Sequence, residues 1–158
     1  MENQYTLSRL SNLRPPLSKT KRVCAFTPEG RKGLHDNLGI DTSLLSRLMR
    51  NPSQGQSVEF NDNKLSLFSA QWGRCGVTQR KFANLIEIHC HHKIPKEKGG
   101  TDAYQNLVLL SEPVHKLVHA TRPETIQKYL DQLHLTKFEI VKLNKLRELV
   151  NLPAIVMT

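Results

Sequence analysis

The sequence predicts an α+β fold that is mostly helical, with two short strands set between helices. Two apolar stretches of strand length, 85–90 and 106–110, lie on either side of a loop that has Gly99-Gly100 at its bend. Before and after this pair, apolar residues recur at helical spacing behind residues that favour helix starts. With 158 residues, the chain has the length of one ordinary domain or two small lobes.

In the N-terminal part we expect a basic, extended leader over 1–26 and then two short helices. The first helix would begin at Thr27-Pro28-Glu29 and end near Gly39, whose lack of a Cβ suits a left-handed cap. The second would be capped by Asp41 and end before Asn51-Pro52.

A third helix is expected before the first strand. It would be capped within 61–63 and end at Gly73. The apolar residues expected on its inner face are Leu65, Leu67, Phe68 and Trp72.

Three further helices are expected after the second strand. Ser111 can cap a helix through 112–120, Pro123-Glu124 favours a start for 123–133, and the last helix would cover 136–150. The apolar residues expected along the last helix are Phe138, Val141, Leu143, Leu146 and Val150.

Composition narrows the class of protein. The net charge of +9 favours a polyanionic partner such as DNA or RNA, although a solvated basic surface explains the charge equally well. Three cysteines with no Cys-x-x-Cys pair argue against a disulfide framework and against a four-cysteine zinc site. The N-terminus lacks the apolar core of a signal peptide, and no apolar run approaches the ~20 residues of a membrane span. We therefore expect a soluble cytoplasmic protein with no membrane partner.

Five histidines fall within 31 residues, at His89, His91, His92, His115 and His119. His91 and His92 end the first predicted strand, and the helix after the second strand presents His115 and His119 at i, i+4 on one face. A strand-loop-strand-helix unit brings the end of its first strand beside that helix. Three imidazoles that converge on one point are typical of a metal site, which we predict here.

The order of these residues resembles the HNH nuclease family, whose fold is the ββα-metal unit. The matching motifs are His91-His92-Lys-Ile-Pro, Gly99-Gly100-Thr-Asp102, Asn106-Leu-Val-Leu-Leu and His115-x-x-x-His119. The double histidine and the His-x-x-x-His close look like the colicin-type branch of this family.

Over about residues 20 to 150, the chain also resembles the C-terminal DNA-binding and endonuclease region of bacterial group II intron reverse transcriptases, or maturases. The family's polymerase core is absent from this sequence. The segments that carry the likeness are 26–31, 51–63, 70–75, 100–107 and 119–125. The domains implied are a basic leader and small helical DNA-binding lobe over 1–52, and an endonuclease domain over 53–158 with its core at about 85–120.

The resemblance implies a role for each site residue. His92 would be the general base, and Asn106 would fix the loop that carries it. His91 and His115 would be metal ligands, with His119 a third ligand or a phosphate contact. The resemblance implies one divalent metal ion, with magnesium or manganese in use, and an all-imidazole set also accommodates zinc or nickel.

The cysteines depart from the family's pattern. Cys75 stands alone where many HNH domains have a zinc knuckle, so a structural zinc is not expected. Cys90 is expected to be a small buried residue rather than a ligand.

The implied partner is DNA, bound at the nucleoid of a bacterial cytoplasm, with intron RNA or a reverse transcriptase as further candidates. The basic residues expected to contact the nucleic acid are Arg22, Arg31, Lys32, Arg74 and Lys93, with Lys96 near the site. The implied activity is strand nicking that leaves a 5′-phosphate and a 3′-hydroxyl. A broad defence or toxin nuclease is an alternative, and so is a non-catalytic nucleic-acid-binding module with a structural metal.

The sequence allows more than one role for three residues near the site. Glu87 either orients a ligand histidine or is an ordinary strand residue. Asp102 is expected to cap or bend the loop. His89 alternates with His91 along the strand, and is expected to be a flanking core or surface residue.

Overall fold

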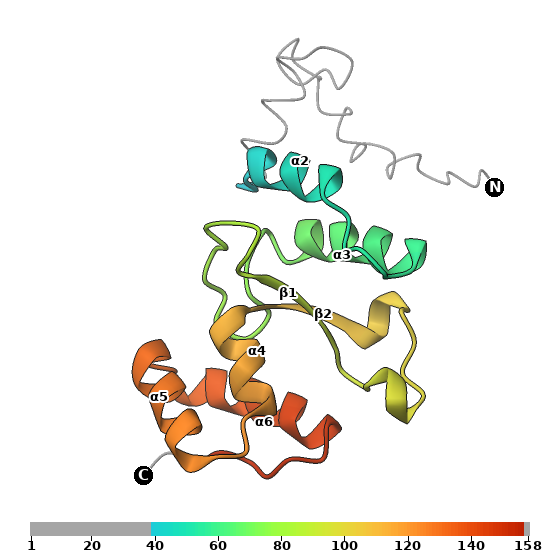
Figure 1. The fold of residues 1–158 in the computed structure, drawn as a ribbon. Helices are drawn as coiled ribbons and strands as arrows, with labels where there is room; N and C mark the ends of the chain where they lie inside the picture. The colour runs from blue at the N-terminus through green and yellow to red at the C-terminus, as the bar shows by residue number, and fades with distance from the viewer. Residues whose placement is uncertain (1–38, 157–158) are drawn as a thin grey trace, which may run out of the picture. The chain divides into compact units, whose positions relative to one another are not determined.

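The computed structural model describes residues 39–156, which confirm the α+β class (Figure 1). Among these residues, two helices precede a pair of strands and three helices follow it. The bounds are α2 Thr42–Arg50, α3 Val58–Ala70, β1 Ile88–His92, β2 Leu107–Ser111, α4 Glu112–His119, α5 Pro123–Leu133 and α6 Lys137–Leu149. The predicted leader and the helix from Thr27 lie outside the described residues. Within them, no helix has the length and apolar character needed to cross a membrane.

The two strands form an antiparallel pair in which His91 lies opposite Val108 and His92 opposite Leu107. Figure 1 shows α3 on one side of this pair and α4 on the other. Because successive side chains of a strand point to opposite faces, His91 and His92 face different helices. The ring of His92 stacks on Phe60 of α3, whereas the ring of His91 meets His115 of α4 edge-on.

The first strand lies slightly later in the chain than the predicted stretch 85–90. The Ile88 amide donates to the Leu85 carbonyl oxygen at 3.2 Å, so the residues before Ile88 form a turn. The strand therefore begins three residues later than predicted, and it ends with His91 and His92 as expected.

The core lies between these layers and is almost entirely aliphatic. Leu109 and Leu110 of β2, Val114 and Leu117 of α4 and Phe68 of α3 are all fully buried. α4 begins at the residue after β2 ends, so no loop separates them. This direct connection fixes where the side chains of α4 lie relative to the strands.

The predicted bounds of the second helix are confirmed. Asp41 caps α2 by accepting a hydrogen bond from the Leu44 amide at 3.0 Å, and α2 ends before Asn51-Pro52. Gly39 has the left-handed φ of +62° expected of it.

The helices after the strands also begin where the sequence predicts. α5 covers 123–133, and Thr136 caps α6 through a reciprocal pair of bonds with Glu139. Ser111 occupies the cap position of α4, but its side chain makes no capping hydrogen bond.

The predicted start and inner face of the third helix are partly wrong. α3 begins at Val58, capped by Ser57, because Asn61 instead bonds the backbone of Ser53. Trp72 lies beyond the end of α3 and is 50% exposed, since the chain turns out of the helix there with φ +56°.

The inner face predicted for the last helix also needs correction. Leu143 and Leu146 are buried as expected, but Phe138 and Val141 are exposed. α6 contacts the rest of the fold along one face, and these two side chains lie on the other. The packed face carries an unexpected residue, Arg147, which is only 1% exposed.

Arg147 ties α6 to the C-terminal end of α4. Its Nη1 donates to the carbonyl oxygens of Leu117, Val118 and Ala120 at 2.6, 3.3 and 2.9 Å, and its Nε donates to that of Pro153 at 2.9 Å. The last carbonyls of a helix lack partners within the helix and carry partial negative charge. The buried guanidinium therefore satisfies the end of the helix that carries two of the clustered histidines.

Replacing Arg147 with methionine is expected to lower the free energy of unfolding by about 2–4 kcal/mol, because buried carbonyl groups lose charged donors. Urea denaturation measures this loss. Lys145→Met is the matched control, since Lys145 is exposed on the same helix and its loss should cost less than about 0.5 kcal/mol. Equal stability of the two variants would contradict a structural role for Arg147.

Candidate metal centre

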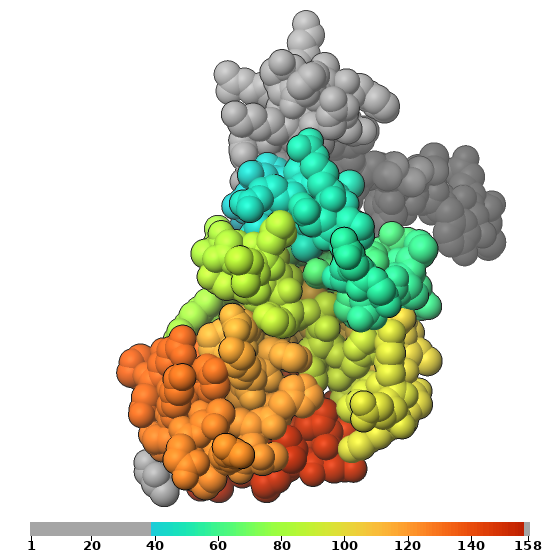
Figure 2. Space-filling view, in the orientation of Figure 1, coloured from blue at the N-terminus to red at the C-terminus, as the bar shows by residue number. Residues whose placement is uncertain are grey.

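Four histidines, one cysteine and two lysines of the described residues line one pocket of about 580 Å³. Figure 2 shows this face hollowed where α4, the loop at 95–98 and the end of α6 meet. The residues that line the pocket are Gln56, Cys90, His91, His92, Pro95, Lys96, Glu97, Lys98, His115, His119 and Val150. The pocket thus collects groups from both sides of the strand pair.

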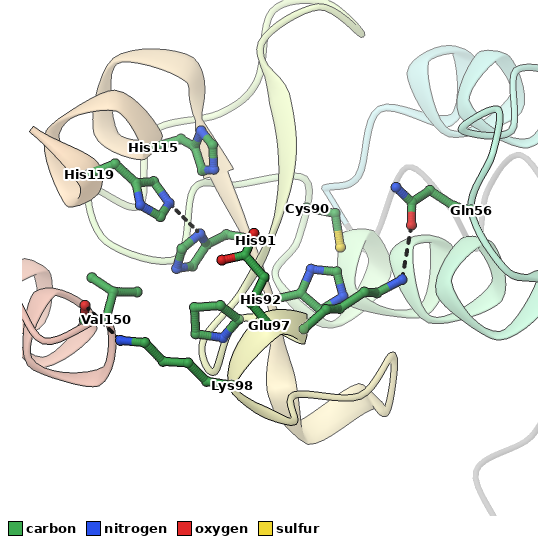
Figure 3. Close-up of a pocket in the computed structure, with 11 residues that line it drawn as sticks. Gln56, Cys90, His91, His92, Glu97, Lys98, His115, His119 and Val150 are labelled. Atoms are coloured by element: carbon green, nitrogen blue, oxygen red, sulfur yellow. Dashed lines mark hydrogen bonds between the residues drawn. The ribbon is translucent and has the colours of Figure 1, made fainter.

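Three of the predicted residues, His91, His115 and His119, form a cluster (Figure 3). Each offers a ring nitrogen, and these nitrogens all lie within 4.8 Å of one another. Nε2 of His119 is 3.4 Å from Nδ1 of His91. The i, i+4 spacing puts His115 and His119 on the same face of α4, and the strand pair brings His91 to that face.

The surroundings of the cluster keep its imidazoles neutral at pH 7. Burial, with a smaller contribution from the neighbouring histidines, lowers the pKa of His91 to about 3. Burial likewise lowers the pKa of His115 to about 4, and burial followed by the charge of Arg147 lowers the pKa of His119. A neutral imidazole has the free lone pair that a metal ligand needs.

The donor set fits a divalent metal ion. Nε2 of His91 is buried and has no hydrogen-bond partner among the residues that the structure describes. A buried polar atom without a partner costs free energy unless another group, such as a metal ion, satisfies it. Three neutral imidazoles at these separations match the protein ligands of a metal site that keeps an open position. No other group of three or more potential ligands is found within residues 39–156.

His92 lies in the same pocket but outside the cluster. Its Nε2 is 2.7 Å from Oδ1 of Asp102, and its ring centroid is 5.4 Å from that of Phe60. The adjacent strand position therefore gives His92 a carboxylate and an aromatic ring in place of the other histidines. Asp102, expected only to cap or bend the loop, contacts His92 directly.

Asn106 closes the loop between the strands. Its Oδ1 accepts from the Ile94 amide at 2.8 Å, and its Nδ2 donates to the carbonyl oxygens of Ile94 and Thr101 at 3.0 and 2.9 Å. Gly100 packs so closely here that a Cβ on it would collide with the carbonyl oxygen of Ile94. The loop that follows His92 is thus held by one amide side chain and one close backbone approach.

The predicted nucleic-acid contacts divide into three groups. Arg22, Arg31 and Lys32 lie outside the described residues. Arg74 and Lys93 bond the carbonyl oxygens of Gln79 and Gln105 and do not line the pocket. Lys96 does line it, together with Lys98, which no sequence motif singled out.

Two further residues whose roles the sequence left open are Glu87 and His89. Glu87 precedes β1 and bonds the Ala83 amide and the Asn84 side chain, so it orients no ligand histidine and is not a strand residue. His89 stacks on His115 with ring centroids 5.1 Å apart.

The two described cysteines differ in burial. Cys75 is fully buried, whereas Cys90, expected to be buried, is only half-buried at the pocket wall. Burial of its thiol still raises the pKa of Cys90 to about 12, so this residue is not a thiolate at neutral pH.

The contacts that cross from α3 to the loop had no signal in the sequence. Ser57 bonds Asp102 across 45 residues, and no spacing within a single element could have revealed that pair. Glu97 of the pocket wall was also missed. Its only sequence signal is its place in the Gly-Gly loop beside two lysines.

Two antiparallel strands followed directly by a helix, with histidines from the first strand and the helix, define a ββα-metal fold. Residues 73–120, which contain β1, β2 and α4, match the model of a family described as HNH endonuclease. No curated protein and no solved structure was found to match the chain. The segment is therefore similar to HNH endonucleases, and the likeness to group II intron proteins stays a prediction.

Removing a ligand from the cluster is expected to weaken metal binding by roughly 100-fold or more, because three donors become two. Calorimetric titration of His115→Ala and His119→Ala with Zn²⁺ measures this. An unchanged affinity in His119→Ala alone would make His119 a phosphate contact, one of the two roles implied for it.

His134→Asn is the matched control for these titrations. His134 is an exposed histidine outside the cluster, and asparagine tolerates its left-handed φ of +46°. Its affinity for Zn²⁺ should equal that of the unsubstituted protein. If all three variants bind alike, the cluster does not hold the metal.

Proposed function

We propose that this protein is a metal-dependent HNH-type endonuclease that hydrolyses phosphodiester bonds in DNA. The observation that carries the proposal is the different surroundings of two adjacent histidines at the end of β1. His91 belongs to a three-histidine cluster on the side of α4, and His92, with its own carboxylate, lies on the side of α3. Both line one pocket.

This arrangement suits in-line displacement at phosphorus, in which the attacking and leaving oxygens lie on opposite sides. Neighbouring positions of a strand present their side chains to opposite faces. A phosphodiester over the end of β1 would therefore have the metal ligands on one side and His92 on the other. A bound divalent ion would supply charge stabilisation for the phosphate and the leaving oxygen.

His92 is proposed to take the proton from the attacking water. Asp102 is a hydrogen-bond acceptor for Nε2, which leaves Nδ1 of the neutral ring to accept a proton. Asn106 is proposed to hold the loop that follows His92, through its three bonds to Ile94 and Thr101.

The basic residues at the pocket are proposed to contact the phosphate backbone. Lys96 and Lys98 both line the pocket that holds the histidines. Ammonium groups in this position would attract the nucleic acid without reading its sequence.

The finer features of the activity rest on the sequence resemblance. We propose that the enzyme nicks one strand, leaves a 5′-phosphate and a 3′-hydroxyl, and uses Mg²⁺ or Mn²⁺. The same resemblance suggests a role in group II intron mobility, with intron RNA or a reverse transcriptase as partner, and a boundary near residue 52 between a DNA-binding lobe and the nuclease domain. The alternative of a non-catalytic module with a structural metal would leave His92 without a function. The ring of His92, however, lies in the pocket beside the carboxylate of Asp102.

The substitution His92→Ala is expected to retain metal and DNA binding while the cleavage rate falls by roughly 10²–10⁴-fold, the usual contribution of a general base. Supercoiled plasmid incubated with Mg²⁺, with Mn²⁺ and with EDTA measures cleavage, and calorimetry measures metal binding. EDTA should abolish cleavage by the unsubstituted protein.

His134→Asn should cleave like the unsubstituted protein, because His134 does not line the pocket. Cleavage by His92→Ala at the same rate would refute the assignment of the base. Degradation of every plasmid to short fragments would favour the broad nuclease over the nicking enzyme.

A further inference from the structure

The carboxylate of Asp102 is the centre of a network that joins the loop after β1 to the start of α3. Oδ1 lies 2.7 Å from Nε2 of His92 and 2.9 Å from Nζ of Lys96. Oδ2 accepts from Oγ of Ser57 at 2.6 Å and from Lys96 at 3.1 Å. Three side chains thus converge on a carboxylate that is only 12% exposed.

The network keeps Asp102 ionised. Hydrogen bonds from Ser57 and His92, and then the bond and charge of Lys96, hold the pKa of Asp102 well below its usual range. An ionised carboxylate has no proton to donate, so the hydrogen atom between it and a neutral His92 must be carried by Nε2. The geometry thereby selects one of the two tautomers of His92.

Three contacts from α3 hold this pair in place. Ser57 donates to Asp102 while its Oγ accepts from the Phe60 amide at 3.0 Å as the cap of α3. Asn63 donates to the backbone oxygen of Asp102 at 2.9 Å. The ring of Phe60 stacks on His92. All three α3-side residues precede residue 73, where the match to the HNH family model begins.

We propose that Asp102 is the positioning residue for His92, and that the start of α3 completes the active site by holding Asp102. In this role Asp102 keeps Nε2 protonated and directs Nδ1 toward the pocket. Ser57 fixes the orientation of the carboxylate. The inference rests on the proposed nuclease function, but the tautomer it assigns to His92 is measurable without cleavage.

A purely structural role for Asp102 predicts different behaviour. As a loop anchor, Asp102 would affect stability, and its replacement would change KM and kcat together through general distortion. As a positioning residue, it should lower kcat far more than it changes KM, because Asp102 itself makes no contact with the phosphodiester. The two roles therefore differ in whether kcat falls without a matching change in KM, and in which ring nitrogen of His92 carries the proton.

Asp102→Asn is the variant that separates these roles. The asparagine amide can donate to Nε2, which favours the tautomer protonated at Nδ1 and removes the proton acceptor from the pocket. We expect kcat to fall by roughly 10²–10⁴-fold, as for other bases held in the wrong tautomer, with KM changed less than about threefold. Zn²⁺ affinity should be unchanged, because Asp102 is outside the histidine cluster.

Asp62→Asn is the matched control, since it makes the same chemical change at an exposed position of α3. It should leave kcat unchanged. Ser57→Gly removes the bond to Asp102 but keeps a residue tolerated at a helix cap, so it separates the two roles of Ser57. Its kcat should fall about tenfold, the loss expected for one hydrogen bond.

Long-range ¹H–¹⁵N correlation spectra of the full chain at neutral to mildly basic pH report the tautomer of His92 directly. The unsubstituted protein should show protonated Nε2, and Asp102→Asn should show protonated Nδ1. Protonated Nδ1 in the unsubstituted protein would overturn the proposal, even if the variant fails to fold.

The kinetic outcomes separate this proposal from the nuclease function on which it rests. A kcat for Asp102→Asn within about threefold of normal would overturn the positioning role while leaving the nuclease function standing. If the unsubstituted protein does not cleave DNA, the proposed function fails, and the spectra alone decide whether Asp102 sets the tautomer of His92.

Discussion

The alternation of side chains along β1 is the constraint on which the site depends. His91 and His92 are adjacent in the chain, so the strand directs them to opposite faces. α4 covers one face and supplies two more histidines, whereas α3 covers the other face and supplies Phe60. A shift of one residue in the strand would exchange the two environments. The register of the strand pair, His91 opposite Val108, therefore sets which histidine joins the cluster and which meets Asp102.

The helix that completes the cluster is positioned from both of its ends. At its start, α4 follows β2 without a loop, so the strand fixes its direction. At its end, Arg147 of α6 bonds three carbonyl oxygens that the helix itself cannot satisfy. After burial, the charge of this guanidinium also lowers the pKa of His119. The C-terminal helices thus contribute both to the stability of the site and to its electrostatics.

Local sequence signals predicted much of the fold and the cluster itself. The cap at Asp41, the bounds of α5, and the i, i+4 pair of His115 and His119 follow from interactions between residues close in the chain. The cap of α3 and the burial of Trp72 and Phe138 were predicted wrongly. In each case the outcome depends on contacts with the rest of the molecule, and helical spacing alone does not decide these.

The sequence by itself determined the strand-loop-strand-helix order and the histidines that line the pocket, because spacing within an element fixes which side chains share a face. Only the tertiary structure decided that Asp102 meets His92, that Ser57 and Asn63 reach it from α3, and that Arg147 closes α4. These contacts join residues 10 to 45 positions apart. Their existence depends on how elements pack against one another, and no periodicity in the chain records that packing.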